Sequence, residues 1–481
     1  MTVQLQRPIL IGGIGLTLGL LSFDSVYHSF SGLGDVLAIG AAAAGASYWW
    51  YSLARKTSPT TLSPLTLDQA VLDQVTSQVQ LVIERLKIES PNSTQTRLLQ
   101  QQLAQAQTNL SRTIRHIAIT GGRKVGKSSL MQLLTSQPVP SATPLKYIET
   151  PALFTVEVDP QTTDTQTQAV ITNADLVIFM TNGDLTATEY SYLFALNQSP
   201  QRVILLLNQV DRYLPDERSA IARKLKTTLD RTLSPQDIIT TSTAPAPMKV
   251  RKIQADGSSV ESIETPPVEL ASLTTQLTNI LATESEKLVL ATTYRQTVAV
   301  QTAAKAVLNS TRQGQALPII DRNQWIVATA AFANPLPALD LLATAAVNAQ
   351  MVIDLGAIYQ QKFSLEHAQV AAGAIGTAIF QLGLVEICTQ TVAGLLKTNA
   401  VTYVAGGLVQ GLSAAYLTRI AGLTLVEYFA AQDLLAPEPT RAWNLGLLSD
   451  TLQRVFQANQ RVAYLQTIFK QGIDKLVPEV V

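Results

Sequence analysis

Apolar residues fall in long uncharged runs near both ends of the chain and in short runs through its middle. The first two runs cover residues 8–23 and 36–54, and their lengths approach the roughly 20 residues that span a bilayer. Arg7 precedes the first run, Arg55 follows the second, and only acidic residues charge the loop between them. The positive-inside rule therefore predicts an N-terminal transmembrane helical hairpin over residues 1–57, with both ends cytoplasmic. The alternatives are a signal peptide or core helices of a soluble domain.

Helical spacing of apolar positions follows over Leu67–Ile88 and Thr94–Leu110, and both segments contain many glutamines. This pattern predicts two amphipathic helices. We expect residues 58–112 to form a helical stalk.

Short apolar runs then alternate with helical patterns through residues 113–283. A run ends at Thr120, and later segments with strand character are Lys146–Ile148, Leu153–Asp159, Leu176–Thr181, Val203–Asn208 and Ile238–Thr243. Alternation of this kind predicts an α/β domain with a mostly parallel sheet and helices on both faces. Residues 248–264 read as a hairpin turning at Asp256-Gly257, which we interpret as a surface decoration.

The region 284–481 is predicted to be an all-α helical domain. Its apolar stretches run over Trp325–Tyr359, Ala368–Leu396 and Thr398–Phe429. Prolines interrupt the first, so a straight membrane span is not expected there. The charged residues inside the stretches are interpreted as a paired polar set, with a substrate path as the alternative; they are Asp340, Glu386, Arg419 and Glu427. Whether these helices enter a bilayer or pack as a soluble core stays open.

Composition favours membrane contact over nucleic acid. Lys+Arg and Asp+Glu balance at 35 each, which leaves no basic field for nucleic acid, so no nucleic-acid partner is expected. Charged residues make up 15% against 47% hydrophobic, which is low for a soluble protein. The single Cys388 excludes a disulfide within the chain, and the three histidines lack metal-ligand spacing.

Residues 121–128 match the P-loop pattern G-x-x-x-x-G-K-[ST]. In such loops backbone amides surround phosphate oxygens, the lysine reaches the β- and γ-phosphates, and the hydroxyl binds Mg²⁺. Lys127 is therefore predicted to stabilise charge during phosphoryl transfer, and Ser128 to bind the metal. The predicted phosphate-binding residues are Gly121, Gly122, Arg123, Lys124, Val125, Gly126, Lys127, Ser128 and Ser129. The alternative is a glycine-rich turn that binds nothing.

Residues 208–211, NQVD, follow an apolar strand and resemble the N-K-x-D base-reading motif of GTPases. The resemblance implies that Asp211 accepts hydrogen bonds from guanine and that Asn208 supports it. Gln209 replaces the usual lysine. Ser242 lies where the last base-contacting loop of that family is expected. Alternatively, Asp211 caps the following helix.

The hydrolytic motif is incomplete in this sequence. The family has D-x-x-G after its third strand, and the place that we assign to it reads Asp159-Pro160-Gln161-Thr162, without the glycine. Asp159 is the candidate Mg²⁺ ligand and Gln161 the candidate water-positioning group. Thr143 and Thr150 are both candidates for the switch threonine. We expect GTP binding with Mg²⁺ and leave GTP hydrolysis open.

The order of these segments, with the phrases NPLPALDLLATAAVNAQMVIDLGAIY and AAYLTRIAG, is similar to cyanobacterial membrane-associated Era-like GTPases that carry a C-terminal YcjF-type domain of unknown function. The resemblance implies GTP binding at Lys127, Ser128, Asn208 and Asp211. The expected partners are guanine nucleotide and membrane lipid, with a homo-oligomer as a further candidate. The expected location is the membrane, with the nucleotide domain on the cytoplasmic side.

Three functions follow from these observations. The first is a membrane-anchored GTPase that couples nucleotide state to a helical membrane-associated domain. The second is a hydrolysis-deficient nucleotide-binding scaffold or sensor for membrane assembly or remodelling. The third is a transporter or channel that uses the C-terminal helices and is regulated by the nucleotide domain.

Overall fold

The computed structural model describes residues 67–154, 160–253, 259–333, 337–397, 405–432 and 443–459. The chain divides into two compact units, Met1–Leu62 and Ser63–Val481, and the described residues all belong to the second. The predicted transmembrane hairpin over 1–57 lies outside the described residues.

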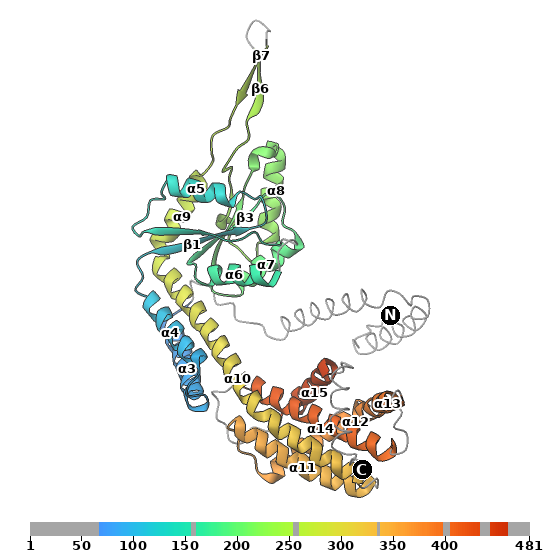
Figure 1. Ribbon diagram of the computed structural model, residues 1–481. Coiled ribbons are helices and arrows are strands. Elements are labelled where there is room, and N and C mark those ends of the chain that lie inside the picture. The colour runs from blue at the N-terminus through green and yellow to red at the C-terminus, as the bar shows by residue number, and fades with distance from the viewer. Residues whose placement is uncertain are drawn as a thin grey trace, which may run out of the picture. The chain divides into compact units, whose positions relative to one another are not determined.

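A five-stranded sheet of order β2-β1-β3-β4-β5 lies at the centre of the nucleotide domain (Figure 1). Every neighbouring pair is parallel, so all five strands end at one edge of the sheet. The strands are β1 Arg115–Gly121, β2 Leu145–Glu149, β3 Leu176–Thr181, β4 Arg202–Leu207 and β5 Ile238–Thr240. The predicted parallel sheet is confirmed. The strand predicted over Leu153–Asp159 is wrong at its start, because Leu153 and Phe154 form a bend.

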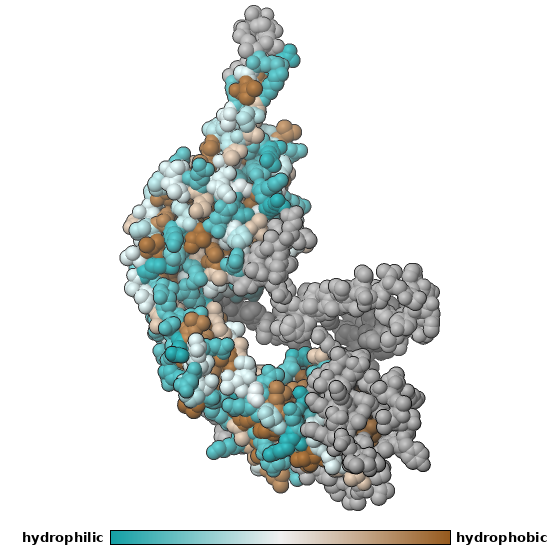
Figure 2. Space-filling model, viewed as in Figure 1, coloured by the Kyte–Doolittle hydropathy of each residue, from teal (hydrophilic) through white to brown (hydrophobic). Residues whose placement is uncertain are grey.

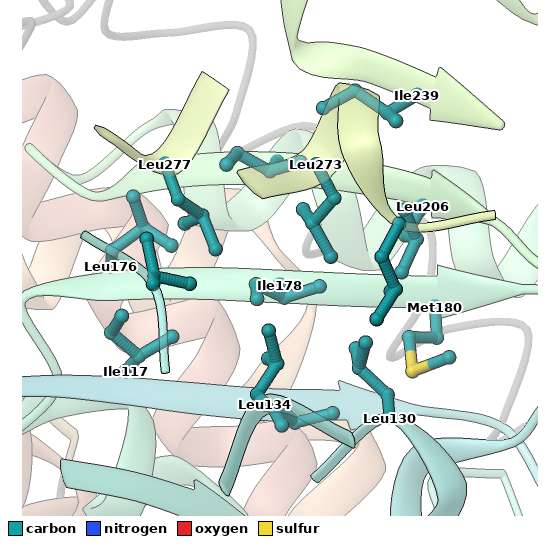
Figure 3. Packing of buried hydrophobic residues seen from close by; sticks show 14 of the residues in the cluster. Ile117, Leu130, Leu134, Leu176, Ile178, Met180, Leu206, Ile239, Leu273 and Leu277 are labelled. Carbon is teal, nitrogen blue, oxygen red and sulfur yellow. The ribbon is translucent and has the colours of Figure 1, made fainter. Parts of the chain in front are cut away.

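Helices cover both faces of the sheet, as predicted. One face packs against α5 (Lys127–Ser136) and α9 (Ala271–Thr283). Figure 3 shows this core, in which Leu130 and Leu134 of α5 and Leu273 and Leu277 of α9 meet Ile178 at the centre of β3. The other face packs against α6 (Pro160–Thr172), α7 (Ala187–Asn197) and α8 (Pro215–Thr228). Two short 3₁₀ helices, η2 Val210–Arg212 and η3 Pro235–Asp237, lie beside β4 and β5.

The predicted hairpin is also confirmed as a two-stranded antiparallel sheet, while its predicted turn at Asp256-Gly257 lies outside the described residues. Strand β6 (Met248–Ile253) pairs with β7 (Ser259–Glu264), from Met248 opposite Glu264 to Ile253 opposite Ser259.

Long helices make up the rest of the described chain. The two predicted stalk helices are α3 (Gln69–Glu89) and α4 (Thr94–Asn109), which pack on α10 through a shared apolar cluster. Helix α10 (Ser285–Ala333) runs unbroken for 49 residues, with Pro318 inside it. The remaining helices are α11 Pro337–Ile358, α12 Leu365–Gln381, α13 Leu384–Lys397, α14 Ala405–Ala431 and α15 Leu445–Asn459.

The charged residues of this helical region do not form the single paired set that the sequence suggested. Arg419 bonds Asp321 of α10, and Glu427 pairs with Arg454 at 3.1 Å. Glu386 accepts a hydrogen bond from Gln390 on its own helix. The side chain of Asp340 lies outside the described residues. Arg419 and Glu427 therefore serve two separate helix–helix contacts, whereas Glu386 bonds within its own helix.

Within the described residues, no single helix is both long enough and apolar enough to span a membrane. Helix α12 together with the first part of α13, Leu384–Val392, is long and apolar enough by composition, but the two parts are bent by 69°.

Candidate functional site

The loop at the end of β1 has the strained backbone that a phosphate-binding loop needs. Gly121 has φ +143° and Gly126 has φ +96°. A Cβ on Gly121 would lie 2.3 Å from the carbonyl oxygen of Met180, and one on Gly126 would lie 2.2 Å from Asn208 Nδ2. Lys124 between them also has a positive φ, of 60°. Both glycines are therefore required by space as well as by backbone conformation.

Lys127 is the first residue of α5, and its side chain lies inside the loop. The residue is only 7% exposed. Its Nζ donates to the carbonyl oxygens of Gly121 at 3.0 Å and Gly122 at 2.8 Å. Burial lowers the pKa of Lys127, and the nearby Glu149 carboxylate opposes that shift. The ammonium is thus held at the centre of the loop, beside the amino end of α5.

Asn208 joins this loop to the loop after β5. The side chain is fully buried, and its Nδ2 donates to Val125 O at 2.8 Å and to Thr243 Oγ1 at 2.9 Å. The backbone N–H of Thr243 donates back to Asn208 Oδ1 at 3.0 Å. Both N–H groups of this side-chain amide donate hydrogen bonds, and its oxygen accepts one. Asn208 therefore fixes the distance between the two loops that would hold opposite ends of a nucleotide.

Asp211 lies in η2 at the same edge of the sheet. The Ser242 hydroxyl donates to Oδ1 at 2.5 Å, and the Ala246 amide donates to Oδ2 at 3.2 Å. Partial burial acts to raise the pKa of Asp211, but these hydrogen bonds outweigh it and lower the pKa below its ordinary value. The carboxylate is therefore ionised at neutral pH and oriented by two donors. It is not placed as a helix cap, because Leu214 occupies the N-cap position of the following helix α8.

Gln209, which stands where the family has lysine, contacts the P-loop. It has φ 60°, and its Nε2 donates to the carbonyl oxygen of Lys124 at 2.9 Å. The residue thus makes a second link between the loop after β4 and the loop after β1. The contact is exposed, in contrast to the buried Asn208 link.

Glu149 belongs to the site, although the sequence analysis missed it. The Ser128 hydroxyl donates to Glu149 Oε1 at 2.9 Å. Glu149 is the last residue of β2, the strand that pairs with β1. The chain that follows the strand beside β1 therefore reads Glu149-Thr150-Pro151-Ala152, ten residues before the place assigned from the sequence. A hydroxyl and a carboxylate are the oxygen ligands that Mg²⁺ prefers, with waters and phosphates completing the shell.

The structure describes the side chains of only two of the other hydrolytic candidates, Thr143 and Thr150. Asp159 and the side chain of Gln161 lie outside the described residues. Thr143 precedes Pro144, whose carbonyl oxygen accepts from the amide of Arg115 at the edge of the sheet where the strands begin. Thr150 is buried, and its hydroxyl donates to Thr120 Oγ1 at 2.9 Å.

A cavity lies next to the segment that follows Glu149. It has a volume of about 1090 Å³ and is lined by α4, α6 and α10 together with Leu153 and Phe154. The amide of Leu153 donates to the carbonyl oxygen of Gly121 at 3.1 Å, and Phe154 has φ 62°. The segment is therefore bonded to the P-loop at one end and lines a cavity against the long helix at the other.

At the opposite edge of the sheet, buried charges join the strands to α10. Arg112 Nη2 bonds both carboxylate oxygens of Asp175 at 2.6 Å, and the Thr292 hydroxyl donates to Oδ1 at 2.8 Å. Arg295 Nη2 donates to Ala174 O at 2.5 Å. Burial lowers the pKa of Arg295 to about 9, against the attraction of Asp175. The long helix is thus held to the sheet by a buried polar network.

Comparison with known proteins gives one family match. Residues 295–461 match the family described as "Domain of unknown function (DUF697)", which begins within α10 and includes the C-terminal helices. A search of curated proteins found no match.

Among solved structures, Toc33 from Arabidopsis thaliana in complex with GDP and Mg²⁺ is 13% identical, covers 40% of this chain and 94% of its own, and has a TM-score of 0.25. LeoA, a bacterial dynamin GTPase from ETEC, is 14% identical over 85% of this chain and 98% of its own, with a TM-score of 0.24. A protein of an oligomerised bacterial dynamin pair is 11% identical, and the match covers 84% of this chain and 79% of its own, with a TM-score of 0.26. Scores this low do not define a shared arrangement of the chain.

Proposed function

We propose that this protein is a membrane-associated guanine-nucleotide-binding protein whose nucleotide state is passed to its helical region, with little turnover in the absence of a partner. One observation carries the proposal. Asn208 links Val125 of the P-loop to Thr243 of the last loop, while Asp211 beside it is ionised and held by Ser242. This arrangement sets a phosphate-binding loop and an acceptor for a base at a fixed separation.

The phosphates would be held by the loop amides and by Lys127. Ser128 would hold Mg²⁺ as a direct ligand, and Glu149 would hold it either directly or through a water molecule. When bound, the metal neutralises charge on the phosphate oxygens. The 2.9 Å contact between the Ser128 hydroxyl and Glu149 supports this assignment, because it shows that both oxygens reach one point.

Guanine would be selected by the carboxylate of Asp211. Guanine offers two adjacent donors, N1–H and the exocyclic amine, whereas adenine has an acceptor at N1. An ionised carboxylate presents acceptors only. The hydrogen bonds from Ser242 and Ala246 keep Asp211 in that form and orient it.

Slow turnover is favoured by the surroundings of the metal position. The connection from α5 to β2 covers residues 137–144, and it lies at the edge of the sheet away from the P-loop. The hydroxyl of Thr150 is engaged by Thr120. Proline at 151 fixes φ and has no N–H, and Ala152 stands where the family has glycine. The second candidate function, a working GTPase, is supported by Lys127 and by the carboxylate of Glu149.

Coupling to the helical region would run through the segment after Glu149. The amide of Leu153 donates a hydrogen bond to the carbonyl oxygen of Gly121 in the P-loop. The cavity that is partly lined by α10 is also lined by Leu153. A shift of this segment on nucleotide binding would change the packing on α10, which continues into the region that matches the family profile. Membrane association would involve the predicted N-terminal hairpin and the bent apolar pair α12–α13.

The test is nucleotide binding and phosphate release by the full-length chain, with fluorescent GTP and ATP analogues. Lys127→Ala should weaken binding of both nucleotides by about 10- to 100-fold, since a charge-assisted contact contributes about 1.5–3 kcal/mol. Asp211→Ala should weaken GTP binding to a similar extent and leave ATP binding unchanged. Lys224→Ala, an exposed substitution on α8, is the control. Failure of the parent chain to bind GTP would overturn the proposal, and steady phosphate release that Lys127→Ala abolishes would favour the second candidate.

A further inference from the structure

The hairpin of β6 and β7 is an insertion with both ends fixed beside the base-reading loop. The hydroxyl of Thr241 donates to the carbonyl oxygen of Glu269, and the amide of Glu269 donates to the carbonyl oxygen of Ser242 at 3.2 Å. The chain therefore leaves the sheet at Ser242 and returns to the same place before α9 begins. An insertion closed at its base in this way can project without changing the domain that carries it.

Both edges of the hairpin are unpaired among the described elements. Strands β6 and β7 form a separate two-stranded sheet and pair only with one another in the part of the chain that the structure describes. Ile263 is 78% exposed and Met248 is 44% exposed. Figures 1 and 2 show the hairpin as a projection that carries both hydrophilic and hydrophobic residues. A two-stranded hairpin alone is marginally stable in water, so a further strand would stabilise it.

The two strands carry opposite charge. Strand β6 contains Lys249, Arg251 and Lys252 and no acidic residue, whereas β7 contains Glu261 and Glu264 and no basic residue. Within one hairpin Arg251 lies opposite Glu261, and Lys249 forms an ion pair with the same carboxylate. Each edge is thus complementary to the other edge of the same chain and repels its own kind.

We propose that the β6 edge of one copy of this chain pairs with the β7 edge of a second copy. Hairpins that point in the same direction would then form a continuous antiparallel sheet in which basic and acidic strands alternate. Pairing of β6 with β6, or of β7 with β7, would place like charges opposite one another. The contact is heterologous, since each added copy leaves one β6 edge and one β7 edge free, so it predicts rows of molecules rather than closed dimers.

This proposal does not depend on nucleotide binding, and a charge-swapped chain tests it. The variant K249E/R251E/K252E/E261K/E264K reverses both strands and keeps the pairs within each hairpin. Full-length parent and variant chains are labelled with donor or acceptor dyes and mixed in pairs under identical conditions. Parent should associate with parent and swapped chain with swapped chain. Parent and swapped chain should associate about tenfold more weakly, because several like-charge cross-strand contacts of about 0.2–1 kcal/mol each add together.

Several results would overturn the proposal. One is a parent chain that stays monomeric at its highest soluble concentration. Another is equal association in the mixed and matched pairs, which would place any contact elsewhere on the molecule. Association that does not weaken as salt is raised would also contradict it, because exposed opposite charges are screened by salt. A variant with only K249E/R251E/K252E, whose two strands are both acidic, should fail to associate with itself and should still associate with an E261K/E264K chain.

Discussion

The two edges of the central sheet are built in different ways from the same strands. At the edge where the strands end, polar groups meet across loops with positive φ at Gly121, Lys124 and Gly126. At the edge where they begin, Asp175 is 1% exposed and bonds Arg112 and Thr292. The first edge is held mainly by hydrogen bonds between loops, among them those of Asn208, Asp211 and Lys127. The second is held by buried charges that reach a long helix.

This difference indicates which edge can adjust. Loops joined by a few hydrogen bonds can rearrange around an anion at small free-energy differences. A buried ion network has no such freedom, because separating the charges leaves each without a partner in a nonpolar environment. The sheet therefore has a responsive edge for a ligand and a rigid edge that ties it to α10.

The largest effect is expected from Asp175→Ala. The substitution leaves Arg112 without its carboxylate partner and removes a nearby negative charge from the buried Arg295. It should lower the free energy of unfolding of the sheet by about 3–5 kcal/mol. Hydrogen exchange of the β3 amides measures this loss of stability. The control is Asp184→Ala, whose partner Lys224 is 66% exposed, and which should change stability by less than about 1 kcal/mol. Equal effects of the two substitutions would show that the edges do not differ in rigidity.

Asn208→Ala should be less damaging to the fold and more damaging to nucleotide binding. The carbonyl of Val125 and the amide of Thr243 would lose their partner, which is expected to lower stability by about 1–3 kcal/mol. Nucleotide affinity should fall at least about tenfold, because the two loops would no longer be held at one separation. Binding titrations and urea unfolding give both values. Gln209→Ala removes only the exposed link to Lys124, and its effect on both values should be clearly smaller; the reverse order would contradict the assignment of Asn208.

Glu149→Gln tests the metal position with a smaller change. The amide oxygen can still accept from Ser128, so the local geometry is kept while the negative charge is removed. The Mg²⁺ concentration needed for half-maximal nucleotide binding should rise by about tenfold. Titration of Mg²⁺ at fixed GTP measures the shift, and Glu286→Gln in the first turn of α10 is the control. An unchanged Mg²⁺ requirement would exclude Glu149 from the metal site.

The parallel sheet, the P-loop and the residues Asn208 and Asp211 could be predicted because each lies on or shortly after a strand with a buried apolar run. Strand β2 was predicted over Lys146–Ile148, but the role of Glu149 at its end was not. The strand sequence LKYIE has charged residues at Lys146 and Glu149 and is only partly buried, since β2 lies at the edge of the sheet. The alternating segment at 153–159 gave a stronger strand pattern, and this displaced the predicted metal ligand to Asp159.

Other features depend on contacts that no local pattern records. Helix α6 is mostly Thr and Gln, so its few apolar positions did not indicate a helix. Asp175 and Thr292 are 117 residues apart in sequence. The only local signal was a charged residue directly before a buried strand, which is where a carboxylate must find a partner.

The smallest effect is expected from an exposed ion pair at the responsive edge. Arg218 of α8 bonds Glu269 at 2.6 Å, and both side chains are partly exposed, at 35% and 48%. Arg218→Ala should lower stability by less than about 1 kcal/mol, and the difference should shrink further as salt is raised. Thermal unfolding of parent and variant at low and high salt measures it. At the rigid edge, Arg202 pairs with Asp237 and Glu284 while only 16% exposed, and Arg202→Ala should be far more costly and nearly independent of salt. A large, salt-independent loss in Arg218→Ala would show instead that the ligand edge is as rigidly held as the edge facing α10.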